Sequence, residues 1–253
     1  MQLKDKVAII TGAASGFGEG IAKRFAAEGA KVVVDDINAA GGERVAEEIR
    51  KAGGAAQFVN ADVTRGADWA ALVTAAQTKF GGLDIVVNNA GWTHRNKPYL
   101  EVTEAEFDHV YAVNVKGIYL SAMHAVPVFR KRGGGAFVNI ASTGGLRPRP
   151  GLTVYNSSKG AVILMSKSMA AEFGPDQIRV NCINPVFCPD TGLSIEFAGG
   201  QNTPEVQARF RATVPMGRLS TVVDVAKAAL FLASDEAAFI SGTCLEVDGA
   251  RCC

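Results

Sequence analysis

Tyr155 and Lys159 are the two side chains in this sequence whose types and spacing suggest catalysis most directly. Residues four apart lie on one face of an α-helix, so a helix here would point a phenol and an ammonium into the same space. The ammonium would favour the phenolate and lower the tyrosine pKa from about 10, giving a base usable near neutral pH. Ser142, thirteen residues before Tyr155, could hydrogen-bond the reacting oxygen. Two surface side chains on an ordinary helix could have the same spacing by chance. Whether this pair is catalytic therefore depends on what the rest of the chain supplies.

A glycine-rich turn near the start of the chain could supply a partner for that base. The segment Thr11-Gly12-Ala13-Ala14-Ser15-Gly16-Phe17-Gly18 follows a β-branched run and precedes a helical pattern. Glycines in such a turn let the backbone approach a pyrophosphate at a helix N-terminus. The Gly-Lys-Ser/Thr of a nucleotide triphosphate loop is absent. A strand–helix turn that binds nothing would look alike, but we expect a dinucleotide to contact Gly12, Ser15, Gly16, Phe17 and Gly18.

Two carboxylates end the second β-branched run. Asp36 follows Gly18 by eighteen residues, near the distance at which an acidic residue pairs with the adenosine ribose hydroxyls. Asp35 and Asp36 would also repel a 2′-phosphate, by about 4 kcal/mol for one contact near 4 Å at an effective dielectric of about 20. No basic residue stands at Ser15 or Ile37 to offset this repulsion. The sequence therefore predicts NAD rather than NADP, with Asp36 and Ile37 beside the adenosine.

The elements that must position these residues alternate along the chain. Short runs rich in Val and Ile predict strands buried on both faces: Val7–Thr11, Lys31–Asp35, Ala56–Asn60, Ile85–Asn88, Ala136–Ile140, Arg179–Ile183 and Cys244–Val247. Amphipathic stretches predict helices between them: Gly16–Gly29, Ala39–Ala52, Ala67–Phe80, Glu104–Arg130, Tyr155–Phe173 and Val222–Ala233. Thr103 and Glu106 predict a capping box, and Gly29, Gly53, Gly81, Gly133 and Gly174 predict helix ends. This alternation predicts a doubly wound parallel sheet in one domain, residues 1–253.

The segment 184–218 interrupts the alternation of strands and helices. It contains Pro185, Pro189, Pro204, Pro215, Gly192, Gly199 and Gly200. An irregular insertion of this length in a compact domain is usually a lid or a binding loop. We expect residues from about 186 to 218 to cover a substrate.

Composition excludes several classes of function. The net charge is +1 and no long basic run is present, so nucleic-acid binding has little support. No apolar stretch reaches about 18 residues and no apolar leader with a cleavage site begins the chain, so we expect no membrane span and no signal peptide. Five cysteines without paired spacing and three histidines favour neither a disulfide framework nor a zinc site. We expect no bound metal and a cytoplasmic location.

These motifs, in this order and spacing, resemble the short-chain dehydrogenase/reductase family over essentially the whole chain. The matching segments are Thr11–Gly18, Asn88-Asn89-Ala90-Gly91, Asn114 in Asn-Val-Lys-Gly, Ser142, Tyr155-x-x-x-Lys159 and Asn184-Pro185. The resemblance implies an α/β Rossmann-type fold, with a seven-stranded sheet covered by helices on both faces, and commonly a homotetramer. Val186 stands where the family often has glycine, a variation that leaves the cofactor prediction intact.

The resemblance also implies where the cofactor would lie. Its contacts would be Asp62 and Val63 at the adenine, Asn89, Ala90 and Gly91 at the adenosine ribose, Tyr155 and Lys159 at the nicotinamide ribose, and Pro185, Val186 and Thr191 at the carboxamide. Each residue alone also has an ordinary structural explanation, such as capping a turn or bracing a helix. Their joint position is what favours the cofactor site.

The implied reaction is the reversible oxidation of a secondary alcohol to a ketone. Tyr155 would take the hydroxyl proton as hydride passes to the nicotinamide, and Ser142 would hold the substrate oxygen. Asn114 would keep a helix opening hydrated, so that water could relay the proton through Lys159. The same groups would serve a reductase of 3-oxoacyl thioesters on a carrier protein, although NADPH use conflicts with Asp36. A non-catalytic dinucleotide-binding scaffold would normally have lost part of the Ser-Tyr-Lys set.

The identity of the substrate is the least defined part of this prediction. Pocket residues are expected to include Trp92, His94, Thr143, Arg149, Phe187 and Cys188. The apolar and aromatic side chains of the lid favour a small substrate that is largely apolar or cyclic. No pair of arginines stands out in the sequence as a site for a carboxylate or phosphate.

Overall fold

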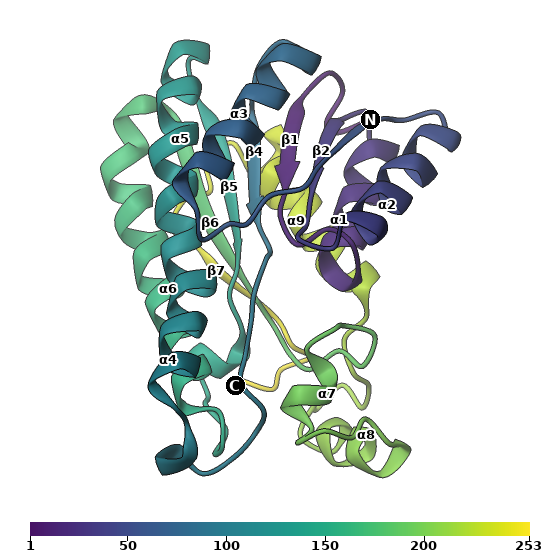
Figure 1. Cartoon of the computed structure of the whole chain (residues 1–253), viewed down its shortest axis with the longest axis vertical. Helices are drawn as coiled ribbons and strands as arrows, with labels where there is room; N and C mark the ends of the chain where they lie inside the picture. The colour runs from purple at the N-terminus through teal and green to yellow at the C-terminus, as the bar shows by residue number, and fades with distance from the viewer.

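A seven-stranded parallel sheet forms the centre of the protein, in a computed structural model that describes residues 1–253 (Figure 1). The strands are β1 (Val7–Ile10), β2 (Lys31–Asp35), β3 (Ala55–Val59), β4 (Ile85–Asn88), β5 (Gly135–Ile140), β6 (Ile178–Pro185) and β7 (Cys244–Val247). Their order is β3-β2-β1-β4-β5-β6-β7, and every neighbouring pair is parallel. The strand order reverses between β1 and β4, which is where an open α/β sheet forms a crevice beyond its carboxyl ends.

Helices cover both faces of the sheet (Figure 1). One layer contains α1 (Gly16–Ala27), α2 (Ala39–Lys51) and α9 (Val222–Ala233), and the other contains α3 (Gly66–Phe80), α5 (Gly117–Arg132) and α6 (Thr153–Phe173). Alternate side chains of a strand enter the two cores: Ile10 packs with the first layer and Ile9 with the second. Because both faces are buried, the strands are nearly continuous in Val and Ile. The predicted doubly wound, seven-stranded α/β fold is confirmed, with strand bounds within two residues of those expected.

The predicted helix 104–130 is wrong in one respect, because a π-helical turn divides it. The capping box of Thr103 and Glu106 begins α4 (Glu104–Tyr111), as expected. The π turn Ala112–Lys116 then separates α4 from α5. Asn114 lies in this turn and directs its amide toward the backbone of Trp92. Single π turns often mark functional positions in helices, and the periodicity of the sequence does not reveal them.

The segment expected to be irregular contains two short helices, α7 (Ser194–Phe197) and α8 (Pro204–Arg211). Thr203 caps α8 by accepting the Val206 N–H, and Pro204 occupies the first turn, where a missing N–H costs nothing. Both helices lie in the lower part of Figure 1, beyond the carboxyl ends of the strands.

Four of the five predicted glycine helix ends have left-handed backbone, and Gly174 is the exception. Its φ is −52°, and it begins a 3-10 turn. The left-handed residue that follows is Gln177, at φ 58°. No helix of the structure is both long enough and apolar enough to cross a membrane.

Candidate active site

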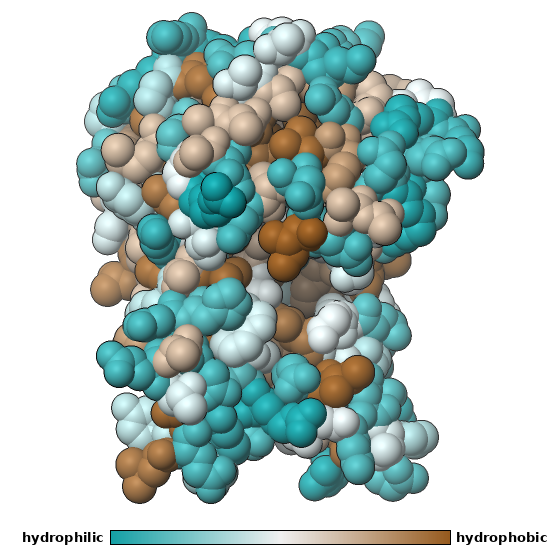
Figure 2. Space-filling model, in the orientation of Figure 1, coloured by the Kyte–Doolittle hydropathy of each residue, from teal (hydrophilic) through white to brown (hydrophobic).

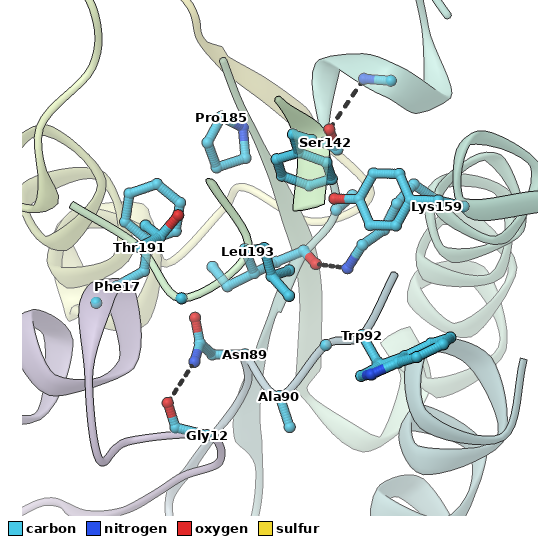
Figure 3. Close-up of a pocket in the computed structure, with 18 of the residues that line it drawn as sticks. Gly12, Phe17, Asn89, Ala90, Trp92, Ser142, Lys159, Pro185, Thr191 and Leu193 are labelled. Atoms are coloured by element: carbon cyan, nitrogen blue, oxygen red, sulfur yellow. Dashed lines mark hydrogen bonds between the residues drawn. The ribbon is translucent and has the colours of Figure 1, made fainter. Parts of the chain in front are cut away.

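A cavity of about 490 Å³ opens beyond the carboxyl ends of β1, β2, β4, β5 and β6. Figure 2 shows one face of the molecule hollowed between the part that contains the sheet and the part that contains α7 and α8. The wall of the cavity includes the glycine turn after β1 and, apart from it, Ser142, Tyr155 and Lys159. Gly12 and Phe17 lie on the opposite side of the close-up from Ser142 and Lys159 (Figure 3). The fold thus joins the two strongest sequence signals in one cavity.

The glycine turn is packed too closely for side chains at two of its positions. Gly12 has a φ of +62°, and a Cβ there would lie 2.8 Å from the Cα of Ala90. A Cβ on Gly18 would overlap the carbonyl oxygen of Gly12. Gly12, Ser15, Gly16 and Phe17 line the cavity, whereas Gly18 lies behind the turn and acts through its lack of a side chain. Helix α1 begins at Gly16, and its first N–H groups have no intrahelical partners, which suits a pyrophosphate.

The end of the cavity near the glycine turn is acidic. Asp36 accepts hydrogen bonds from the N–H groups of Ala14 (2.9 Å) and Asn38 (2.8 Å), and so fixes the turn. Asp35, Asp36 and Asp62 all line the wall, together with Ile37 and Val63. Asp35 is buried and neither carboxyl oxygen has a hydrogen-bond partner. Burial, followed by the charge of Asp36, raises the pKa of Asp35 well above its usual range.

The segment after β4 ties this end of the cavity to the glycine turn. Asn89 donates to the carbonyl oxygens of Thr11 and Gly12, each at 2.9 Å, and Figure 3 shows the bond to Gly12. The hydroxyl of Thr11 accepts from the N–H groups of Asn89 and Ala90. Asn89, Ala90 and Gly91 line the wall, as do Pro185, Val186 and Thr191 from the lid side. All predicted cofactor residues except Gly18 therefore line one continuous cavity.

Tyr155 and Lys159 lie on α6, both less than 6% exposed. The Lys159 ammonium donates to the carbonyl oxygen of Ile140 at 2.8 Å and lies 5.7 Å from the centroid of the tyrosine ring. Burial raises the pKa of Tyr155 to about 12, a rise that the hydroxyl of Ser142 opposes. Burial lowers the pKa of Lys159 to about 8. The structure thus differs from the predicted lowering of the tyrosine pKa by the lysine: burial raises the pKa of Tyr155, and the Lys159 ammonium is bonded to Ile140 instead.

Asn114 lies one layer behind the cavity wall. Its Oδ1 accepts the N–H of Trp92 at 2.8 Å, and its Nδ2 donates to the carbonyl oxygen of Trp92 and to Ser158. A Cβ built on Gly91 would lie 3.5 Å from Asn114 Oδ1 and 3.6 Å from Lys159 Nζ, so both groups approach the same backbone position. The structure thus gives Asn114 a positioning role on Trp92, and its part in a proton relay stays a prediction.

The expected substrate residues divide into those in the cavity and one outside it. Trp92, Thr143, Arg149, Phe187 and Cys188 line the wall. His94 does not, which corrects the prediction. The loop turns its ring inward, so that His94 is 1% exposed and its Nδ1 lies 2.8 Å from the carbonyl oxygen of Arg95.

Residues that the sequence did not single out also line the wall. Three lie between Ser142 and Lys159 in the sequence: Arg147, Leu152 and Asn156. Their place between two candidate catalytic residues is the signal that could have identified them. Asn96 and His109 have no comparable signal, since each comes from a loop or helix face that only the tertiary structure brings to the site.

Comparison with known proteins identifies the family. A family model described as enoyl-(acyl carrier protein) reductase matches residues 12–250. Over 251 residues the chain is 51% identical to a 4-formylbenzenesulfonate dehydrogenase from Comamonas testosteroni, with 99% of each chain covered. The chain belongs to the short-chain dehydrogenase/reductase family. It is therefore an oxidoreductase of a family whose dehydrogenases use a nicotinamide cofactor.

Two further short-chain dehydrogenase/reductase relatives show how varied the substrates within this similarity are. A 2,5-dichloro-2,5-cyclohexadiene-1,4-diol dehydrogenase from Sphingobium indicum is 42% identical over 255 residues, covering 98% of this chain and 96% of the relative. The crystal structure of a 3-ketoacyl-(acyl-carrier-protein) reductase from Brucella melitensis, complexed with NADH, superposes with a TM-score of 0.93. It is 47% identical and covers 99% of this chain and 100% of that one.

Proposed function

We propose that the enzyme interconverts a secondary alcohol and a ketone with NAD, using Tyr155 as the general acid and base. The observation that carries this proposal is the shared cavity, which has the glycine turn in one part of its wall and Ser142, Tyr155 and Lys159 in another. A hydride acceptor bound at the turn could thus reach a carbon whose oxygen lies at Tyr155. When bound, the nicotinamide supplies the hydride chemistry, and the protein supplies placement and proton transfer.

Proton transfer would depend on the buried phenol. With a pKa of about 12, Tyr155 is protonated at neutral pH and suits the role of acid for ketone reduction. In oxidation it must first release that proton, and the Ser142 hydroxyl, which favours the phenolate, assists this step. Ser142 would also hold the substrate oxygen. Lys159, close to Gly91, would bind the nicotinamide ribose, and Asn114 would keep the helix opening behind it in place for a water relay.

The acidic end of the cavity supports NAD rather than NADP. Asp36 is fixed at the turn by two backbone N–H groups, and no basic residue lines the wall beside it. A 2′-phosphate would meet Asp36 with no counter-charge. The alternative is a 3-oxoacyl-thioester reductase that uses NADPH. One solved relative is described as a 3-ketoacyl-(acyl-carrier-protein) reductase, but its structure contains NADH, and NADPH would conflict with Asp36 here.

The substrate proposed here carries a ring. Trp92, Phe187, Phe197 and Phe210 line the cavity, and the ring of Phe197 lies edge-on to that of Tyr155 with centroids 5.0 Å apart. The names of two relatives, a formylbenzenesulfonate and a cyclohexadienediol dehydrogenase, also describe ring compounds. We further propose that residues 1–253 act as one nucleotide-binding domain with a lid at about 186–218, and that the enzyme is a homotetramer.

A dehydrogenase assay with a panel of cyclic and aryl secondary alcohols tests this function. We expect an absorbance increase at the nicotinamide band with NAD, and a much lower kcat/KM with NADP. Reduction of 3-oxoacyl thioesters with NADPH, without oxidation of any alcohol, would favour the alternative. Mass measurement of the intact assembly tests the tetramer.

A further inference from the structure

The charged side chains of the cavity wall are separated by sign. The acids Asp35, Asp36 and Asp62 follow β2 and β3, near the glycine turn. The arginines Arg147 and Arg149 lie in the loop between Ser142 and α6. Lys159 is the other cation of the wall, and it is bonded to the carbonyl oxygen of Ile140. The two arginines are thus the cations that face the substrate part of the cavity.

Arg149 has its guanidinium over an aromatic ring of the lid and its backbone bonded to α6. Its guanidinium lies 4.4 Å from the centroid of Phe210, and Phe210 stacks on Phe187 with centroids 4.0 Å apart and an interplanar angle of 5°. Its Nη2 donates to the hydroxyl of Thr213 at 3.0 Å. The carbonyl oxygen of Arg149 accepts from Asn156, the residue after Tyr155, at 2.9 Å. The lid therefore places the guanidinium, and α6 fixes the backbone of the same residue.

Arg147 and Arg251 extend this positive charge. Arg147 donates to the carbonyl oxygen of Arg251 at 2.5 Å, and Arg251 donates back to the carbonyl oxygen of Arg147 at 3.3 Å. Arg251 is only 6% exposed, and its buried Nε has no hydrogen-bond partner. Burial and the charges of Arg251 and Arg147 together lower the pKa of Arg149 to about 10. The guanidiniums of Arg147, Arg149 and Arg251 therefore lie close enough to repel one another.

No carboxylate compensates this cluster. Eight other arginines of the chain pair with acids, as Arg218 does with Asp224 at 2.7 Å and Arg44 with Glu19 at 2.8 Å. None of Arg147, Arg149 and Arg251 has an acidic side chain within 4.0 Å. Guanidiniums bind planar or tetrahedral oxyanions through two parallel hydrogen bonds, which is the counter-charge missing here.

We propose that Arg147 and Arg149 bind an anionic group on the substrate, a carboxylate or a sulfonate, while the ring of the substrate packs against Phe187 and Phe210. This inference rests on the proposed dehydrogenase function and narrows its substrate to ring compounds that carry both an alcohol or ketone and an acid group. It differs from the sequence-based expectation, in which no pair of arginines stood out as a site for a carboxylate or phosphate. The sequence places Arg147 and Arg149 close together, but only the tertiary structure brings Arg251 to them and shows that no acid pairs with the three.

Binding of ketones to the NAD-saturated enzyme tests the inference without turnover, because an oxidised cofactor cannot reduce a ketone. Calorimetry would compare acetophenone with 4-acetylbenzoate and 4-acetylbenzenesulfonate. We expect the two anions to bind at least about tenfold more tightly than acetophenone. One hydrogen bond to a charged group would account for a difference of this size. Arg149→Gln should reduce that preference to about threefold or less, and Arg149→Lys should retain part of it. The ratio between the two anions identifies the preferred oxyanion.

Arg211→Gln is the matched control, because Arg211 is exposed at the end of α8 and does not line the cavity. It should leave the preference for anions unchanged. Equal binding of acetophenone and both anions would overturn the inference. So would a preference that survives in an Arg147→Gln, Arg149→Gln double variant whose circular dichroism spectrum matches that of the wild type.

A kinetic comparison separates this inference from the proposed function. Oxidation of 1-phenylethanol with no preference for its 4-carboxylate or 4-sulfonate analogue would retain the dehydrogenase and overturn the anion site. Anion-selective binding without oxidation of any alcohol would retain the anion site and overturn the dehydrogenase. Reduction of acetoacetyl-CoA, a thioester that carries phosphates, tests whether the arginines serve a different kind of anion. If Arg149→Gln impaired its reduction and left binding of the aromatic anions unchanged, the arginines would serve a phosphate-bearing thioester, and the inference would fail.

Discussion

The two ends of the cavity differ in how they are built. The nucleotide end consists largely of backbone, since the glycine turn, the start of α1 and the segment after β4 are held by hydrogen bonds between main-chain groups and Asp36, Thr11 and Asn89. The substrate end consists of side chains from the loop before α6, from α6 itself and from the lid. The first end is acidic and the second basic. A site built from backbone needs particular residue types, such as glycine, at fixed distances along the sequence. A site built from side chains can draw its residues from any part of the chain, so it leaves no fixed sequence pattern.

Of the changes that test this difference between the two ends, removal of the Asp36 charge should have the largest effect, on the choice between NAD and NADP. In Asp36→Asn the side chain keeps an oxygen for the Ala14 N–H but loses its repulsion of a 2′-phosphate. We expect the NAD to NADP ratio of kcat/KM to fall about 100-fold, less than the full Coulomb energy because the site is partly solvated. Steady-state kinetics with both cofactors would measure it. An unchanged ratio would remove Asp36 from the explanation of cofactor choice.

A side chain in the glycine turn should disturb the same end through the backbone. In Gly18→Ala the new methyl group would overlap the Gly12 carbonyl oxygen, and the turn must shift. We expect NAD to bind about 30-fold more weakly, equivalent to about 2 kcal/mol. Gly174→Ala is the control, since a Cβ there meets nothing within 4 Å and its φ of −52° suits alanine. Similar NAD affinity in both variants would contradict the packing argument.

The pH profile tests the chemistry at the substrate end. Oxidation requires the phenolate of Tyr155, and with a pKa of about 12 its fraction rises about tenfold per pH unit between pH 7 and 9. We therefore expect kcat/KM for alcohol oxidation to rise across this range and that for ketone reduction to stay nearly level. An oxidation rate that is already flat at pH 7 would instead agree with the pKa lowering expected from the sequence.

The smallest effect should come from Asp35→Asn, which we expect to change the free energy of unfolding rather than catalysis. Its pKa is raised in the folded protein, so the bound proton stabilises the fold fully below pH of about 4 and is lost as pH rises through the folded value. Asp35→Asn keeps a neutral side chain at every pH. Urea unfolding should show no gain near pH 4 and a gain of about 1 kcal/mol near pH 8. The exposed Asp108→Asn serves as control, and a gain that does not depend on pH would refute the raised pKa.

The sequence predicted the sheet and the nucleotide end well, for physical reasons. Buried parallel strands need continuous Val and Ile, and the turn at Gly12 and Gly18 tolerates no side chain, so both leave clear patterns. It could not predict the π turn around Asn114, which changes hydrogen bonding without changing residue types. It also missed the burial that raises the Tyr155 pKa and the approach of Arg251 to Arg147, since both depend on tertiary packing.

The central claim, that one cavity joins a nicotinamide site to a proton-transferring tyrosine, is tested most directly by Tyr155→Phe. The substitution removes one hydroxyl from a buried ring and leaves every glycine-turn contact in place. NAD affinity and kcat for the best alcohol found in the panel would be measured on the same preparation. We expect NAD to bind as in the wild type while kcat falls by about 10³-fold or more. A variant that keeps wild-type turnover would contradict the account.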